Sequence, residues 1–271
     1  MNAAQADAPV WKVSKGDHEL YIGGTIHVLQ EQDYPLPVEF ERAYAEADKL
    51  VFEVDIAQAS SLAFQQNLMQ AALYDDGSTL VSHLRPSTLW QLTAFTKRRG
   101  IELETLLSFK VGMLVVILTV NELNLHGIQG EGVDQYFSLR ASQDQKPVAA
   151  LESIEQQIEF LSTMGEGEED QLVLQTIEEL EDLGEEFFAL KSAWRQGDTR
   201  ALKEIGLEDF QAFPGAYQSI LVNRNRAWLP KIEAMLEDPS VEYVLVGVLH
   251  LVGEDSVLAM LEAKGYRVER F

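Results

Sequence analysis

Two apolar segments near opposite ends of the chain end in the same Gly-x-x-His pattern. The first reads ELYIGGTIH and ends at His27, and the second reads EYVLVGVLH and ends at His250. Each segment has the composition of a buried strand, and its glycine lets the backbone turn or lets another group approach closely. We therefore expect each histidine to project from the carboxyl end of a strand, where α/β sheets bind their ligands.

Two further apolar segments, LVFE and AALE, end in acidic residues, Glu53 and Glu152. A carboxylate in an apolar, β-rich run is costly unless it is paired or bound to a metal. The four segments together predict a cluster of His27, Glu53, Glu152 and His250 at strand ends. Two imidazoles and two carboxylates suit zinc, manganese, cobalt or iron, and such an ion would activate water for hydrolysis. One carboxylate could be a ligand and the other a general base.

Each of these residues also has a purely structural interpretation. A lone histidine at a strand end is usually a hydrogen-bonded structural residue, although its recurrence in two similar segments favours a functional role. Glu53 could face solvent together with Asp55 on a half-exposed strand. Glu152 could lie in the first turn of a helix, where the helix dipole favours a negative charge. The remaining histidines lie beside loops or polar runs and are expected at the surface: His18, His83 and His126.

The composition excludes several classes of protein. With 21 Lys and Arg against 44 Asp and Glu, the net charge is −23, which argues against nucleic acid as a partner. The chain has no cysteine, so disulfides, thiol catalysis and cysteine-ligated metals are excluded. The longest apolar run, near 111–120, is about half the length of a membrane span. We therefore expect no transmembrane segment and a buried helix at that run.

The order of the expected elements predicts an α/β fold in one domain over 1–271. Short strands are widely spaced, and residues about 57–146 and 153–238 have mainly helical patterns. This predicts a central mixed β-sheet with two similar strand–Gly-x-x-His halves and a large helical insertion. Within the helical parts, Ser87 is expected to cap a helix, and Pro230 is expected to kink a helix or to begin a new one.

The first residues, MNAAQADAPV, are small and polar. We expect residues 1–9 to be flexible, and Ala4-Gln-Ala6 and Ala6-Asp-Ala8 resemble the small-x-small end of a signal peptide. The corresponding hypothesis is a periplasmic or secreted protein whose leader has been replaced by Met1. A cytoplasmic protein with a ragged N-terminus is the alternative.

An ordered set of motifs resembles the TraB/GumN family, which is related to the animal Tiki proteins. The resemblance covers about Val10 to Phe271. Its motifs are GTIH at 24–27 followed by YPLP at 34–37, LVFEVD at 50–55, GVDQYF at 132–137, ALE at 150–152, Arg224-Asn225 followed by Trp228, GVLHLVGED at 247–255 and GYRV at 265–268.

The resemblance implies an α/β fold shared with erythromycin-esterase-like and haem-binding ChaN-like proteins. It also implies a metal site on the two Gly-x-x-His motifs and a glutamate, so that His27, His250 and Glu53 would bind manganese, cobalt or zinc. Tiki proteins are metal-dependent proteases that cleave secreted signalling proteins. The resulting hypothesis is a metal-dependent hydrolase that acts as a peptidase, with His27 and His250 as ligands or transition-state stabilisers.

The Arg224-Asn225 pair lies in an expected amphipathic helix. An arginine there usually extends to solvent, but Arg224 could instead hold a substrate carboxylate or an active-site glutamate in a bidentate pair. Asn225 could orient a ligand or stabilise an oxyanion. The hypothesis thus places Glu53, Glu152, Arg224 and Asn225 in the catalytic site, with Glu152 in a supporting role.

Two rival functions remain open from the sequence. The first is a non-enzymatic protein that captures a peptide, haem or another small ligand in the same cleft. The second is a regulatory protein that acts through the acidic helix at 171–194, although such a charge run is usually a solvated helix face.

Overall fold

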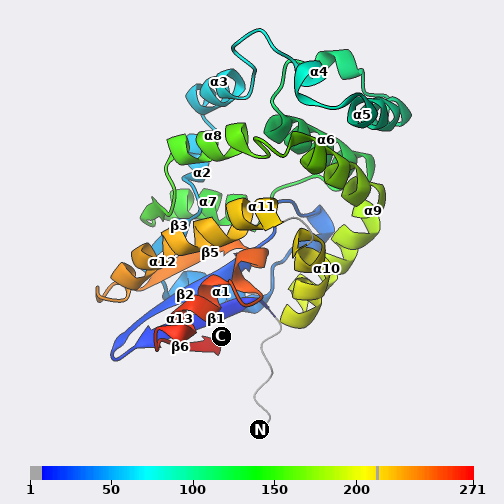
Figure 1. The fold of residues 1–271 in the computed structure, drawn as a ribbon. Helices are drawn as coiled ribbons and strands as arrows, with labels where there is room; N and C mark the ends of the chain where they lie inside the picture. The colour runs from blue at the N-terminus through cyan, green and yellow to red at the C-terminus, as the bar shows by residue number, and fades with distance from the viewer. Residues whose placement is uncertain (1–7, 212–213) are drawn as a thin grey trace. The chain divides into compact units, whose positions relative to one another are not determined.

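The computed structural model describes residues 8–211 and 214–271, and the chain divides into two units. The first unit combines the segments up to residue 57, 128–153 and 187–271, and the second combines 58–127 and 154–186. The first unit carries a β-sheet and the second is mainly helical (Figure 1). The prediction of flexibility at residues 1–9 falls largely outside the described residues.

The sheet of the first unit has six strands among the described residues, in the order β4-β3-β5-β2-β1-β6. They are β1 (Val10–Lys15), β2 (His18–Thr25), β3 (Lys49–Phe52), β4 (Val148–Ala150), β5 (Glu242–Gly247) and β6 (Arg267–Arg270). Neighbouring strands from β4 to β2 are parallel, whereas β1 is antiparallel to both β2 and β6. The sheet is therefore mixed, as predicted. The carboxyl ends of β2, β3, β4 and β5 lie at one edge.

The two Gly-x-x-His strands are direct neighbours in the centre of the sheet. Gly24 of β2 is in register with Val246 of β5, although more than 200 residues separate them in the sequence. Alternate residues of β5 face opposite layers, and all but the last residue of β5 are buried. Burial on both faces explains why this segment reads as a continuous apolar run.

Helices cover both faces of the sheet (Figure 1). On one face, Val244 and Val246 belong to a core that includes Trp228 of α12 (Asn223–Met235) and Leu261 of α13 (Val257–Ala263). On the other face, Tyr243 contacts Phe137. The helices on this second face are α1 (Val38–Glu46), α7 (Val133–Asp144) and the end of α9 (Glu169–Arg195).

Pro230 lies inside α12 and does not begin a new helix. The buried Trp228 and Ile232 on either side of it are held in the core, so packing outweighs the low helix propensity of proline. A π-helical turn, Gln218–Val222, directly precedes α12. It follows α10 (Thr199–Gln211) and the short α11 (Pro214–Tyr217).

The second unit has its own apolar core. Its helices are α3 (Leu62–Ala71), α4 (Leu80–His83), α5 (Pro86–Arg98), α6 (Val111–Leu125), α8 (Ile154–Thr163) and the first part of α9, and α2 (Ile56–Ala59) crosses into it. The predicted cap at Ser87 is wrong, because Pro86 occupies the first turn of α5 and Arg85 is the N-cap. Within the described ranges, no helix has both the length and the apolar character of a membrane span.

The acidic part of α9 forms ion pairs inside the second unit. Asp170 lies 3.0 Å from Arg85, and Glu181 is paired with Arg98. These contacts are those of an ordinary solvated helix face with local charge pairing.

Candidate functional site

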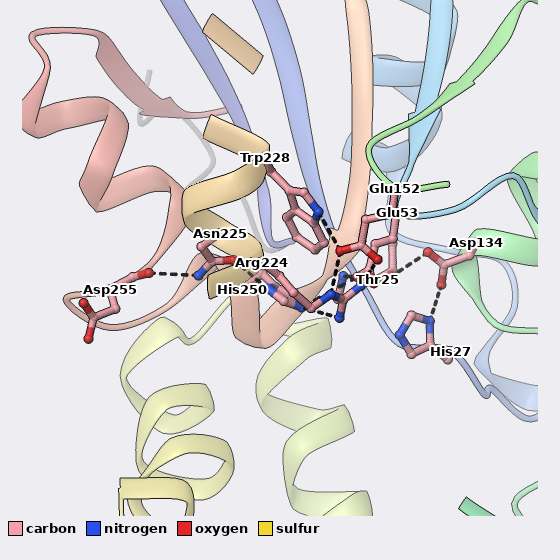
Figure 2. Close-up of polar contacts among 11 residues, drawn as sticks. Thr25, His27, Glu53, Asp134, Glu152, Arg224, Asn225, Trp228, His250 and Asp255 are labelled. Atoms are coloured by element: carbon pink, nitrogen blue, oxygen red, sulfur yellow. Dashed lines mark hydrogen bonds and ion pairs between the residues drawn. The ribbon is translucent and has the colours of Figure 1, made fainter. Parts of the chain in front are cut away.

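The four residues predicted from strand ends do lie at the same edge of the sheet (Figure 2). His27 follows β2, Glu53 directly follows β3, Glu152 follows β4 and His250 follows β5. They converge on Gly247, since a Cβ atom there would lie 3.3 Å from Glu53 Oε1, 3.5 Å from His250 Cδ2 and 3.6 Å from His27 Nε2. A side chain at this glycine would crowd all three groups.

Two predicted element boundaries are wrong at the site. The strand expected at 50–56 ends at Phe52, so Glu53 lies beyond it, and the helix expected from Glu152 begins at Ile154. The backbone leaves the sheet at these acids because their side chains turn into a polar cluster instead of continuing the strand. The solvent-facing interpretation of Glu53 and the helix-dipole interpretation of Glu152 are therefore both wrong.

Glu53 is a buried carboxylate with a hydrogen bond to each oxygen. Its side chain is 11% exposed, Oε1 accepts from the Gly247 backbone N–H at 2.7 Å and Oε2 accepts from Arg224 Nη2 at 2.6 Å. Burial alone would raise the pKa of Glu53, but Arg224, His250, His27 and the Gly247 N–H outweigh it and lower the pKa to about 2. Glu53 is therefore an anion at neutral pH.

Glu152 is held by Arg224 in a bidentate pair. Arg224 Nε donates to Oε1 at 2.7 Å and Nη2 donates to Oε2 at 3.0 Å, and Trp228 Nε1 also donates to Oε1 at 2.8 Å. The glutamate side chain is 10% exposed and that of Arg224 is 13% exposed. The guanidinium thus points into the site and bridges both glutamates, which rejects the solvent-facing interpretation of Arg224.

Helix α12 positions Arg224 through its neighbours. The guanidinium lies over the indole ring of Trp228, one turn further along the helix, at 4.8 Å from its centroid, and Trp228 is completely buried. Stacking on an aromatic face and a two-carboxylate fork are both arrangements that arginine provides and lysine does not.

His250 is buried, and its tautomer follows from its hydrogen bonds. Asn225 Nδ2 donates to the backbone oxygen of Asp255 at 2.8 Å, so the amide oxygen faces His250 Nδ1, 2.6 Å away. Nδ1 must therefore carry a proton and Nε2 a lone pair. This Nε2 lies 3.4 Å from Arg224 Nη1. Burial lowers the pKa of His250 to about 4, and the imidazole is neutral at pH 7. Asn225 acts as the predicted orienting residue.

His27 is the accessible member of the cluster, with a side chain that is 65% exposed. Its Nδ1 lies 2.8 Å from Asp134 Oδ2, and the second oxygen of that carboxylate accepts from Thr25 Oγ1 at 3.0 Å. The charge of Asp134 raises the pKa of His27 to about 9. His27 is therefore an imidazolium at neutral pH, with Nε2 toward solvent.

The sequence analysis missed the roles of Thr25 and Asp134, although both lie in motifs quoted above. The available signal was the Gly-rich loop before Asp134. A Cβ at Gly132 would lie 2.2 Å from the backbone carbonyl carbon and oxygen of His27, so only glycine allows the start of α7 to approach this segment. That approach places the Asp134 carboxylate against the imidazole.

The other three histidines lie outside the cluster. His126 is exposed, as predicted. His18 is half-buried and its Nδ1 lies 2.9 Å from the backbone oxygen of Asp238. His83 is also half-buried, because its ring stacks on that of Tyr74 at 4.2 Å, so the surface prediction for it is wrong.

The buried groups predict that acid destabilises the protein. The pKa of His250 is about 4 in the fold against an ordinary 6.5, and that of Glu53 is about 2 against 4.5. For both, the unfolded chain binds the proton more readily. The His250 contribution is therefore complete above about pH 6.5 and is lost on the way to pH 4, and that of Glu53 is lost between 4.5 and 2. Urea unfolding at about pH 7.5 and 4 should differ by on the order of 3 kcal/mol from His250 alone, and His250→Gln should reduce that difference. An unchanged pH dependence in the variant would contradict the assignment.

The residues as arranged do not fit a divalent metal ion. Across residues 8–211 and 214–271, no group of three or more His, Asp or Glu side chains is placed to hold one. The physical reason is that the guanidinium of Arg224 already lies between Glu53 and Glu152, and an imidazolium at His27 has no lone pair to offer. The metal-ligand role of these residues stays a prediction.

Comparisons with known proteins agree with the motif analysis. The pattern of the TraB/PrgY/gumN family matches residues 9–270. Among curated proteins, the uncharacterized protein YbaP of Escherichia coli (strain K12) is 24% identical over 247 residues, which cover 91% of this chain and 89% of that protein. YbaP of Shigella flexneri matches to the same extent. No solved structure matches significantly. Because the family pattern covers nearly the whole chain, this protein belongs to the TraB/PrgY/gumN family.

Proposed function

We propose that this protein is a hydrolase that cleaves amide bonds of peptides at the strand-end cluster. The observation that carries the proposal is a pair of histidines with opposite environments beside one glycine. His27 pairs with a carboxylate and is accessible, whereas His250 is buried and bonded to an amide. Environments that drive the pKa values of two titratable groups apart are typical of a general acid and a general base.

In the proposed reaction the two imidazoles transfer protons in opposite directions. His250 Nε2 accepts a proton from water as the water oxygen adds to the substrate carbonyl carbon. Its present contact with Arg224, at 3.4 Å, is long for a hydrogen bond. His27 then donates its proton to the leaving nitrogen as the C–N bond breaks. The proton on His250 returns to solvent with the products.

The preference for amides rests on the acid. An amine is a poor leaving group unless it is protonated as the C–N bond breaks, so a histidine that stays charged up to about pH 9 suits this step. Asp134 and Thr25 act as positioning residues, because they hold Nδ1 and leave Nε2 for the substrate. The resemblance of the motifs to those of a protease family supports the same substrate class.

The experiment is a cleavage assay with a mixed peptide library read by mass spectrometry. The wild-type chain should produce defined fragments, and His27→Ala and His250→Ala should not. His126→Ala is the matched control, since His126 is an exposed histidine of the second unit and its loss should change nothing. Peptide binding without fragments would favour the non-enzymatic alternative, and equal cleavage by all variants would reject the proposed site.

A further inference from the structure

We propose that the Arg224 guanidinium takes the place of a divalent cation in this site, and that Glu53, Glu152 and His250 become a cation site only when Arg224 is removed. The inference concerns which positive charge neutralises the two glutamates. It therefore holds whether or not the protein hydrolyses peptides.

The first argument is the occupancy of the carboxylate oxygens. Both oxygens of Glu152 accept from Arg224, and Glu53 Oε2 does so as well. The remaining oxygen, Glu53 Oε1, accepts from the backbone N–H of Gly247. A metal ion would have to take lone pairs that already receive hydrogen bonds, three of them from a group that is charged at every pH at which proteins fold.

The second argument is the position of the guanidinium between its partners. One nitrogen, Nη2, contacts both glutamates, at 2.6 and 3.0 Å, and another, Nη1, is 3.4 Å from His250 Nε2. Figure 2 shows these side chains meeting at the Arg224 head group from separate elements. A point in contact with two carboxylates and an imidazole nitrogen is where a divalent ion with nitrogen and oxygen ligands would lie.

The third argument is that the ligands would remain in place without the arginine. Glu53 is held by Gly247, Glu152 by Trp228 and His250 by Asn225, and none of these contacts involves Arg224. His250 Nε2 and Glu53 Oε1 already lie 3.9 Å apart. Truncation to alanine would therefore leave an anionic hollow with oriented donors.

The test compares wild-type protein with Arg224→Ala and with Arg226→Ala. Arg226 is an exposed residue of the same helix and serves as the matched control. Each protein is treated with EDTA, desalted and titrated with cobalt, manganese or zinc chloride, with calorimetric binding and the Tm as readouts. We expect no stoichiometric binding by wild type or R226A, and one equivalent bound by R224A with a raised Tm. A second change, Glu53→Gln, should abolish the binding gained by R224A.

Two results would overturn the inference. One is a wild-type protein that retains one equivalent of metal when purified without chelator or loses Tm on EDTA treatment. The other is a folded R224A chain that takes up no ion. If R224A does not fold, the wild-type metal content and Tm decide alone. Because no readout involves peptide cleavage, failure here is distinguishable from failure of the proposed hydrolysis.

Discussion

Replacement of Arg224 by methionine should lower the free energy of unfolding by about 3–5 kcal/mol, which is the effect of removing one partner from a buried ion pair. The guanidinium bridges Glu53 and Glu152, whose side chains are almost fully buried. Without it, two carboxylates of like charge face one another in a site with little solvent. The methionine retains much of the side-chain volume, so the loss reports charge and not a cavity.

Urea denaturation of the two proteins at neutral pH measures this loss. Arg226→Met, at an exposed position of the same helix, should change stability by less than about 0.5 kcal/mol. The triple variant that adds Glu53→Gln and Glu152→Gln should recover most of the loss, because a neutral cluster needs no counter-charge. A loss below about 1 kcal/mol would mean that the bridge seen here does not carry the charge balance of the site.

His27→Gln should lower kcat/KM for peptide cleavage by about 10²–10⁴-fold, the range typical of a lost general acid or base. Stability should hardly change, because the His27 side chain is mostly exposed. Steady-state kinetics together with urea denaturation separate the two effects. A variant that loses both activity and stability would indicate a structural role instead.

Asp134→Asn tests the same histidine through its pH profile. The wild-type rate should fall as pH rises through about 9, where His27 loses its proton. Without the negative charge of Asp134, the pKa of His27 falls, and the basic limb of the profile should move with it toward the ordinary value of 6.5. A basic limb that stays near 9 would show that another group supplies the proton.

The location of the site could be predicted from the sequence because strand polarity is local information. Each apolar run with Gly-x-x-His or a terminal glutamate indicates a strand and its carboxyl end, and parallel strands bring those ends together. His27, Glu53, Glu152 and His250 were found this way. The neighbouring positions of β2 and β5, however, depend on strand order, which no local pattern encodes.

The electrostatic partners could not be predicted, because each depends on a contact between distant segments. Arg224 reads as an ordinary helix-surface arginine until α12 is packed on the sheet with Trp228 beneath it. Asp134 lies 107 residues from His27 in the sequence. A spacing rule that finds metal ligands therefore identifies the histidines but not whether each is charged or neutral.

The strand order also has a consequence for biosynthesis. Strand β5 lies between β2 and β3 but follows both of them in the sequence, so the ribosome releases it after the strands that it must join. Until then Glu53 lacks the Gly247 N–H and the arginine of α12, and His250 does not yet exist in the nascent chain. Proteins fold as units while synthesis proceeds from the N-terminus. Insertion of this central strand is therefore the step that completes the site, and a prematurely terminated chain that lacks β5 holds only half of the charge cluster.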